Sequence, residues 1–159
     1  MKKFELTSET KINIFGKKLF RIKALVSFGV VKTGETGGWV EKEENVNQSG
    51  DAWVFDNAEV FGNARVFGNA EVSDNAWVSG NARVFDNADY ATIHGFGTQF
   101  RTTTFFRCKD KQVKVSCGCF YGTIPEFCEQ VKNTRKGKIA EEYLMIADLM
   151  EKHFAEEAK

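Results

Sequence analysis

Hydrophobic and polar residues repeat with a period of six through the middle of the chain. Residues 50–91 form seven hexads of the pattern Gly/Asp-Asn-Ala-x-Val-x, in which Asp51 replaces Asn once and Tyr90 replaces Val once. Alternate side chains of an extended backbone point to opposite faces, so the Ala and the Val of each hexad share one side. We expect that side to form the interior and the fourth and sixth positions to face outward.

The Gly/Asp-Asn pairs are the predicted corners between hexads. Gly, Asn and Asp tolerate left-handed or otherwise tight backbone conformations, so each pair allows the chain to turn. Three hexads then close a triangular turn of 18 residues. Residues 18 apart in the sequence should therefore stack at about 4.8 Å, the spacing of neighbouring strands.

Apolar and polar residues also alternate on both sides of the repeat. The runs KINIF and LFRIKAL flank residues 15–18 and predict a β-hairpin within residues 1–36. The runs TQFRTTTFFR and QVKVS flank the turn-like residues 108–111 and predict a second hairpin within residues 96–115.

The end of the sequence has helical spacing. Thr123 can cap a helix that has Pro125 in its first turn and Glu126 at its third position, and this helix should run to about Lys132. The basic stretch 133–138 interrupts it. A C-terminal amphipathic helix is then predicted by apolar residues at steps of three and four, which are Ile139, Tyr143, Ile146, Ala147, Met150 and Phe154.

The hexads resemble the hexapeptide repeat of the trimeric acyltransferase-like superfamily, which forms a left-handed parallel β-helix. Val60 and Ala64, then Val66 and Ala70, reproduce the aliphatic and small positions of that repeat. Gly lies one place later than in many enzymes of the superfamily. Right-handed β-helices of polymer-forming cytoskeletal proteins also have short Gly-rich periods, and between the two hands we favour the left.

Together these patterns predict a mainly β fold. Its centre would be a left-handed parallel β-helix of hexapeptide repeats in residues 37–95. Residues 1–36 are expected to form an N-terminal β-hairpin, and residues 96–159 a small C-terminal α+β subdomain with a hairpin and two helices. A length of 159 residues fits this arrangement, because it allows one compact domain or two small subdomains.

A second resemblance extends over almost the whole chain. The segments RIKAL and TGETGGWVEKEENV before the hexads, and TTTFFRCKD, VKVSCGCFYGTIPEF and AEEYLMIADL after them, are similar to small proteins of bacteriophage and prophage origin. Those proteins pair hexad repeats with such a tail. The resemblance implies a phage accessory protein that acts in the bacterial host cell, and it implies no particular reaction.

Charge and hydropathy narrow the possible partners. The 22 Lys and Arg residues balance the 22 Asp and Glu residues, so no overall field favours DNA, RNA or an anionic membrane. No segment approaches the roughly 20 apolar residues of a membrane span, and the N-terminal residues do not resemble a secretion signal. We expect a cytoplasmic protein in which any basic site is local.

Catalytic chemistry is not expected in the repeat. Acyltransferases that resemble it commonly use a histidine as general base, and carbonic-anhydrase-like relatives bind zinc through three histidines. The histidines here, His94 and His153, both lie outside the hexads. We therefore predict a protein that is not an enzyme and has no cofactor.

Four cysteines fall within 21 residues and could offer thiolates to a zinc ion. Their spacing does not match the usual C-x2–4-C knuckles, so we expect buried free thiols, with a zinc site or a reactive pair as alternatives. They are Cys108, Cys117, Cys119 and Cys128.

Stacking at 18 residues sorts the outward positions into three faces, which are called the first, second and third face below. Each face combines fourth and sixth positions of successive hexads. The residues are Trp53, Glu71, Asp89, Phe55, Ser73 and Ala91 on the first face, Glu59, Trp77, Phe61 and Ser79 on the second, and Arg65, Arg83, Phe67 and Phe85 on the third.

The third face is the candidate binding surface, because stacked arginines repel each other unless an anion or a carboxylate lies over them. Three uses are possible: a subunit interface, a surface covered by the C-terminal helix, or a site that clamps the phosphate and base of a nucleotide. Lys109, Lys111, Arg135 and Lys136 could add to a pocket. The candidate ligand- or partner-binding residues are Arg65, Arg83, Phe67, Phe85, Trp53, Trp77, Arg101 and Arg107.

We thus predict a noncatalytic phage accessory protein that counteracts a host defence system. It would bind a host protein or sequester a nucleotide-type signal, and it would form a homo-oligomer, with a trimer favoured. The alternatives are a hexapeptide acyltransferase-like enzyme and a structural protein that forms filaments.

Overall fold

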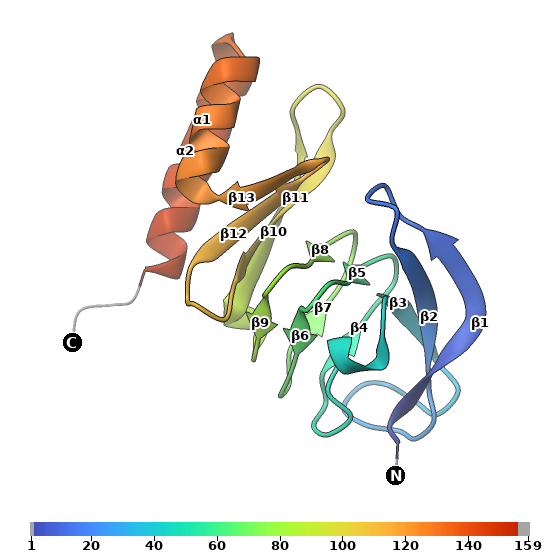
Figure 1. The fold of residues 1–159 in the computed structure, drawn as a ribbon. Coiled ribbons are helices and arrows are strands. Elements are labelled where there is room, and N and C mark those ends of the chain that lie inside the picture. Colours follow the sequence, from blue (N-terminus) through green and yellow to red (C-terminus); the bar gives the residue numbers. More distant parts are fainter. Residues whose placement is uncertain (1, 156–159) are drawn as a thin grey trace.

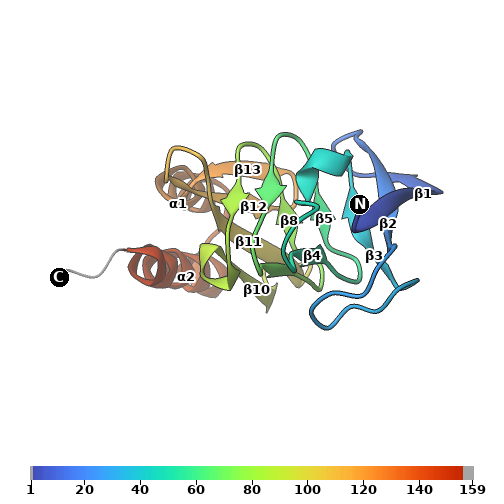
Figure 2. The same ribbon diagram turned by 90° about the horizontal axis from the view of Figure 1, so that it is seen from below.

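The computed structural model describes residues 2–155 and places the hexads between two larger units. Figure 1 shows the N-terminal strands on one side, the hexads in the middle, and a sheet with two helices on the other side. The view in Figure 2 shows the same order along the molecule. None of the described helices is both long enough and apolar enough to cross a membrane.

The elements have the following bounds. The N-terminal elements are β1 (Phe4–Ile12), β2 (Lys18–Ala24), β3 (Thr36–Val40) and the 3-10 helix η1 (Glu43–Asn45). The hexads contribute β4 (Trp53–Val54), β5 (Glu59–Val60), β6 (Arg65–Val66), β7 (Glu71–Val72), β8 (Trp77–Val78) and β9 (Arg83–Val84). The C-terminal elements are the 3-10 helix η2 (Asn87–Asp89), β10 (Tyr90–Phe96), β11 (Arg101–Arg107), β12 (Val113–Cys117), β13 (Phe120–Thr123), α1 (Ile124–Thr134) and α2 (Gly137–Phe154).

The predicted fold class, a mainly β chain built on a left-handed parallel β-helix, is wrong. The chain is mixed: β1, β2 and β3 pair antiparallel before β5 and β8 join their sheet in parallel, and β10 to β13 form an antiparallel sheet next to α1 and α2. The reason is strand length. Each hexad strand has two residues, as in β4, whereas β1 has nine, so the flanking strands form the longer hydrogen-bonded ladders and set the architecture.

Within this mixed fold, the expected 18-residue stacking of the hexads is confirmed. Three parallel strand pairs have that register, β4 with β7, β5 with β8, and β6 with β9. Backbone bonds hold the turns together, for example from the Phe67 N–H to the Val84 carbonyl at 2.8 Å. The fourth and sixth positions therefore lie in rows, as the three faces require.

The corners also match the sequence pattern until the seventh hexad. Positive φ angles recur every six residues, and they include the non-glycine corners Asp56 at 53° and Asp74 at 59°. Asp86 instead has an extended backbone, and its side chain accepts a hydrogen bond from the Ala88 N–H at 2.7 Å as the cap of η2. The repeat ends there because this cap directs the chain into β10.

The Ala and Val positions of the first six hexads form the interior, as predicted. Each of these side chains is 0% exposed, and burying one Val contributes roughly 1.5–3 kcal/mol. The residues are Ala52, Val54, Ala58, Val60, Ala64, Val66, Ala70, Val72, Ala76, Val78, Ala82 and Val84.

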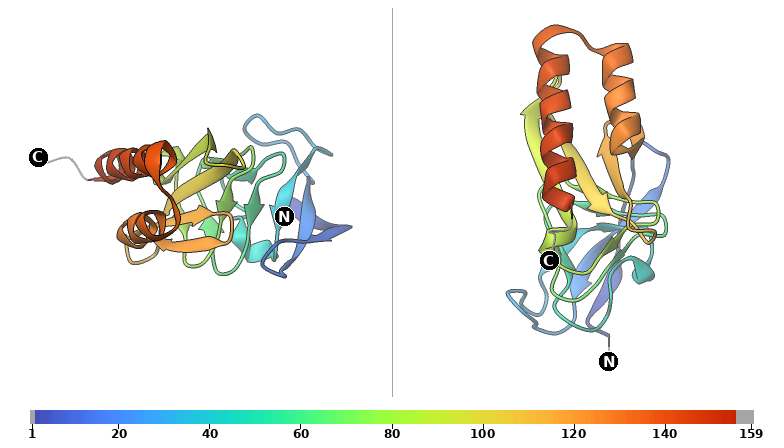
Figure 3. Two further views of the ribbon diagram at one scale, coloured as in Figure 1. Left: turned by 90° about the horizontal axis from the view of Figure 1, so that it is seen from above. Right: turned by 90° about the vertical axis from the view of Figure 1, so that its left-hand side faces the viewer.

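The predicted C-terminal elements are confirmed, and two further strands extend them. The hairpin forms from β11 and β12, with β10 and β13 added on its edges. Thr123 and Glu126 form the expected capping box of α1. One face of the sheet carries α1 and α2, which lie side by side in Figure 3, and the buried residues of α2 are Tyr143, Ile146, Ala147, Met150 and Phe154.

Candidate functional site

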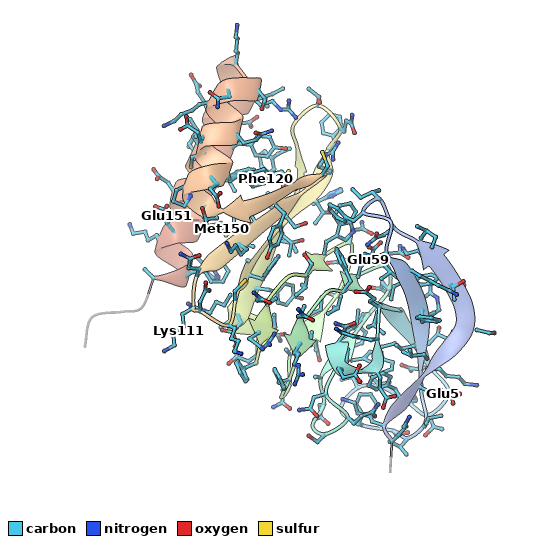
Figure 4. All side chains as sticks on the ribbon, viewed as in Figure 1. Glu5, Glu59, Lys111, Phe120, Met150 and Glu151 are labelled. Carbon is cyan, nitrogen blue, oxygen red and sulfur yellow. The ribbon has the colours of Figure 1, made fainter. Side chains whose placement is uncertain are left out.

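The second face is covered by the N-terminal hairpin. The ring of Phe15 lies 5.7 Å from that of Phe61 and 5.9 Å from that of Trp77. Glu59 is buried there, and its carboxylate binds the Lys11 ammonium at 3.1 Å. Figure 4 shows Glu59 between the hexads and the N-terminal strands. Trp77 is therefore half-buried in an intramolecular contact.

The first face is also largely occupied by the chain itself. Trp53 is 1% exposed, and its ring packs edge-on against Phe4 at 5.8 Å and against Phe28 at 5.3 Å. Lys3 lies over the Phe28 ring at 4.5 Å. Trp53 is therefore a core residue in this structure and does not lie on a binding surface.

The third face is open. Arg65 pairs with Arg83 in the parallel register, and the rings of Phe67 and Phe85 stack with centroids 4.9 Å apart and planes at 13°. Phe85 is 57% exposed. The structure thus assembles the four residues as the 18-residue spacing predicts. The C-terminal helix does not cover them, because α2 packs on the four-stranded sheet.

The two arginines of the third face differ in how they are held. The Arg83 guanidinium donates to the Asn63 carbonyl at 2.7 Å and to the Ala82 carbonyl at 2.9 Å. Arg65 is exposed. Backbone carbonyls accordingly offset part of the repulsion at Arg83, while the charges of both side chains remain available to an anion.

Two cavities lie along the third face. One has a volume of about 540 Å³ and the other about 550 Å³, so each falls in the size range of small-molecule sites. Arg83 and Lys109 line both of them, so the two cavities adjoin. The first is lined by Phe67, Arg83, Phe85, Asp89, Arg107, Cys108, Lys109 and Lys111, and the second by Lys42, Glu44, Asn63, Ala64, Arg65, Asn81, Arg83 and Lys109.

Positive charge dominates these cavities. Their linings carry six Lys or Arg side chains against Glu44 and Asp89. Asp89 is already paired with Arg107 at 3.1 Å, so it neutralises only one of the cations. The surface can therefore attract an anion although the whole chain has no net charge.

The turn between β11 and β12 brings lysines to the third face. Cys108 forms an isolated bridge with Ala82, and the Lys109 N–H donates to the Asn81 carbonyl at 2.8 Å. These bonds dock the turn on the hexads, so Lys109 and Lys111 border the stacked phenylalanines. Arg135 and Lys136 do not line these two cavities.

Sequence reasoning missed three side chains of the site that carry hydrogen-bond donors. Lys42 donates from its ammonium to the Asn63 side chain at 3.1 Å, and Asn63 and Asn81 both line the second cavity. The asparagines stand 18 residues apart at equivalent corners, so the repeat spacing could have identified them. Lys42 lies outside the hexads and carries no such signal.

The other two predicted arginines lie far apart along β11. Arg107 contacts both Asp89 and, at 5.2 Å, the ring of Phe154, so it borders the third face. Arg101 lies at the opposite end of the strand and donates to Gln99 at 2.6 Å. The structure therefore adds Arg107 to the third face and separates Arg101 from it.

The cysteines do not gather around one point. Burial raises the pKa of the Cys108 thiol to about 11, whereas Cys119 is exposed at the turn between β12 and β13. Cys117 accepts a hydrogen bond from the Thr103 hydroxyl at 3.2 Å, and Cys128 is half-buried on α1. Among residues 2–155, no three His, Cys, Asp or Glu side chains form a group that could hold a metal ion.

Neither histidine lines the third-face cavities. His94 lies on β10, where its Nδ1 is 2.9 Å from the Thr102 hydroxyl. His153 packs against the Phe154 ring on α2.

No protein-family model matches the chain, and no curated protein gives a significant match.

Proposed function

We propose that this chain is a noncatalytic binding protein that captures a small nucleotide-type ligand on its third face. The observation that carries the proposal is the open, stacked pair of Phe67 and Phe85 beside Arg83, Lys109 and Lys111 in one cavity. Flat aromatic surface next to concentrated positive charge matches a ligand that joins a base to a phosphate.

The chemistry of each part supports this assignment. Stacking of a base on an aromatic side chain contributes about 1–3 kcal/mol and tolerates any base. Guanidinium groups bind phosphate oxygens through two parallel hydrogen bonds, and lysines add compact positive charges. A nucleotide with its base against Phe85 would reach Arg83 and Lys109 with its phosphate, since all three line the same cavity.

The biological setting of the proposal comes from the sequence. Similarity of the flanking segments to phage and prophage proteins supports a role in the cytoplasm of a bacterial host. There the protein would counteract host defence by lowering the free concentration of a nucleotide signal. We include homo-oligomerisation in the proposal, with a trimer favoured, because the hexads resemble the repeat of the trimeric acyltransferase-like superfamily. In the proposed oligomer the interface leaves Phe85 open to the ligand.

The direct test is retention of a ligand. The protein would be purified from bacteria that express a nucleotide-based defence, examined by native mass spectrometry, and then titrated calorimetrically with mono- and dinucleotides. We expect the double variant Arg65→Ala and Arg83→Ala to lose binding. The matched control is Lys136→Ala with Lys138→Ala, which removes two exposed positive charges away from the third face.

Two results would contradict the proposal. If no nucleotide binds the purified protein at millimolar concentration, the third face is not such a site. If the double arginine variant binds as tightly as the control variant while both melt like the wild type, the ligand lies elsewhere.

A further inference from the structure

A separate cavity of about 360 Å³ lies at the far end of the C-terminal sheet. It opens between the β10–β11 loop, the β12–β13 turn and the two helices. Figure 4 shows Phe120, which lines it, at one end of the sheet, and Lys111 of the third-face cavity at the other. The two cavities share no lining residue.

Two arginines from different elements line this cavity. Arg101 comes from β11 and Arg135 follows α1. Arg101 donates to the neutral side chain of Gln99 at 2.6 Å, and Arg135 donates to the Thr134 carbonyl at 3.4 Å. In the described part of the chain, neither arginine has a carboxylate partner within ion-pair distance. Among the described residues, two positive charges therefore border one hollow whose lining contains no carboxylate.

Glycines in the adjoining turns leave room for two of the polar groups. The Arg101 guanidinium lies against Gly118, and the Tyr143 hydroxyl lies against Gly97, in the places that a Cβ at either glycine would occupy. Both glycines also have positive φ angles, 58° at Gly118 and 80° at Gly97. A side chain at either glycine would clash with these groups, so the two glycines make room for the donors of Arg101 and Tyr143.

Tyr143 supplies a neutral donor to the cavity. The residue is 5% exposed, and its ring packs edge-on against Phe127 at 5.7 Å. The hydroxyl keeps its proton at neutral pH because the ordinary pKa of tyrosine is about 10, and burial beside the Cys117 thiol raises this pKa further. A protonated phenol beside two guanidinium groups can donate to the same anion as they do.

We propose that this cavity binds the phosphate group of a small phosphate monoester that carries an apolar ring. Two uncompensated guanidinium charges match the charge of about −1.5 to −2 on a phosphate monoester at neutral pH better than the single charge of a carboxylate. The Gln130 side chain adds an amide to the lining, and Phe120 borders the space for the ring. The site is independent of the nucleotide site on the third face.

Phenyl phosphate is a suitable probe, because it has one phosphate and one ring. Titration of isotopically labelled protein followed by NMR should move the amide signals of Gly97 and Gly118. The double variant Arg101→Ala and Arg135→Ala should raise the dissociation constant at least about ten-fold, because each charged hydrogen bond removed is worth that much or more. Lys17→Ala with Lys32→Ala is the matched control, because these exposed lysines line neither cavity, and it should leave the constant measured at the Gly97 and Gly118 signals unchanged.

A second variant and a second probe keep the test informative. Tyr143→Phe retains the packed ring and should weaken phenyl phosphate binding several-fold, with melting temperature measured for every variant. Benzoate, which has the same ring and a single carboxylate, should bind more weakly than phenyl phosphate. The site is refuted if phenyl phosphate at millimolar concentration leaves the Gly97 and Gly118 signals unmoved, or if these signals give the same dissociation constant for the Arg101 and Arg135 variant as for the wild type. Equal or tighter binding of benzoate would overturn the phosphate assignment.

Discussion

The second and third faces start from the same repeat and end with opposite surroundings. Both present aromatic rings at outward hexad positions, Phe61 with Trp77 on one and Phe67 with Phe85 on the other. Phe61 is 5% exposed beneath the N-terminal hairpin, while Phe85 is 57% exposed. The repeat therefore fixes where a side chain points, and the flanking segments decide whether it becomes core or surface.

The second and third faces also differ in whether their charged side chains are neutralised within the chain. On the second face, buried Glu59 is neutralised by Lys11 from the hairpin. On the third face, the flanking turn brings Lys109 and Lys111, which add to the charge of the hexad arginines. A carboxylate compensated within the chain needs no ligand, whereas positive charge that accumulates in an open cavity favours an external anion.

The largest expected loss of stability follows from a substitution on the second face, which the N-terminal hairpin covers. Phe61 packs with Leu19, Trp39 and Trp77. Replacing Phe61 by Ala should lower the free energy of unfolding by about 3–5 kcal/mol, because it removes a buried aromatic side chain and leaves a cavity. Urea denaturation followed by fluorescence would measure the change in midpoint. A cost below about 1 kcal/mol would mean that the hairpin does not stay packed on the second face in solution.

A smaller effect on the free energy of unfolding, one that depends on pH, is expected at Lys3, where the N-terminal segment covers the first face. The Lys3 ammonium is buried and donates to the Ala52 carbonyl at 2.7 Å. Burial lowers its pKa in the folded state from 10.5 to about 8. Between these values the unfolded chain binds more protons than the folded one, so the contribution of Lys3 to stability rises with pH.

The measurement compares the wild type with Lys3→Met across that window. From about pH 7.5 to about pH 10, the wild type should gain about 2 kcal/mol relative to the variant. Taking the difference is necessary because burial also raises the pKa of Tyr121 to about 12 and of Cys108 to about 11, which opposes the trend in both proteins. A difference that is independent of pH would show that Lys3 is solvated in the folded state.

Local pattern was enough to predict most elements of this fold. Alternation identified both hairpins, and the capping box at Thr123 marked the start of α1. The mixed sheets were missed because they depend on pairing between distant segments. β3 joins the antiparallel hairpin to the parallel strand β5, and no local signal in Thr36–Val40 specifies either partner.

The candidate site was predictable to the extent that it belongs to the repeat. The 18-residue spacing placed Arg65 over Arg83 and Phe67 over Phe85. The same spacing did not reveal that Trp53 would be buried, because Phe4 and Phe28 come from the N-terminal segment. Periodicity describes the rows of side chains but not the segments that fold over them.

The smallest expected effect on stability is at Phe85. It gives the clearest contrast between the open third face and the covered second face. Replacing this exposed ring by Ala should change the free energy of unfolding by no more than about 0.5 kcal/mol, as for other surface positions. Nucleotide binding should nevertheless weaken by about 1–3 kcal/mol, because the stacking surface is lost. Calorimetric titration and urea denaturation of the same preparation would separate the two quantities.

The opposite result would have a definite physical meaning. If Phe85→Ala destabilises the protein about as much as Phe61→Ala, then Phe85 is buried in solution although it is 57% exposed in a single chain. Coverage by another copy of the chain would make stability depend on protein concentration. Stability that is independent of concentration, together with weakened nucleotide binding, would instead leave the third face open for a ligand.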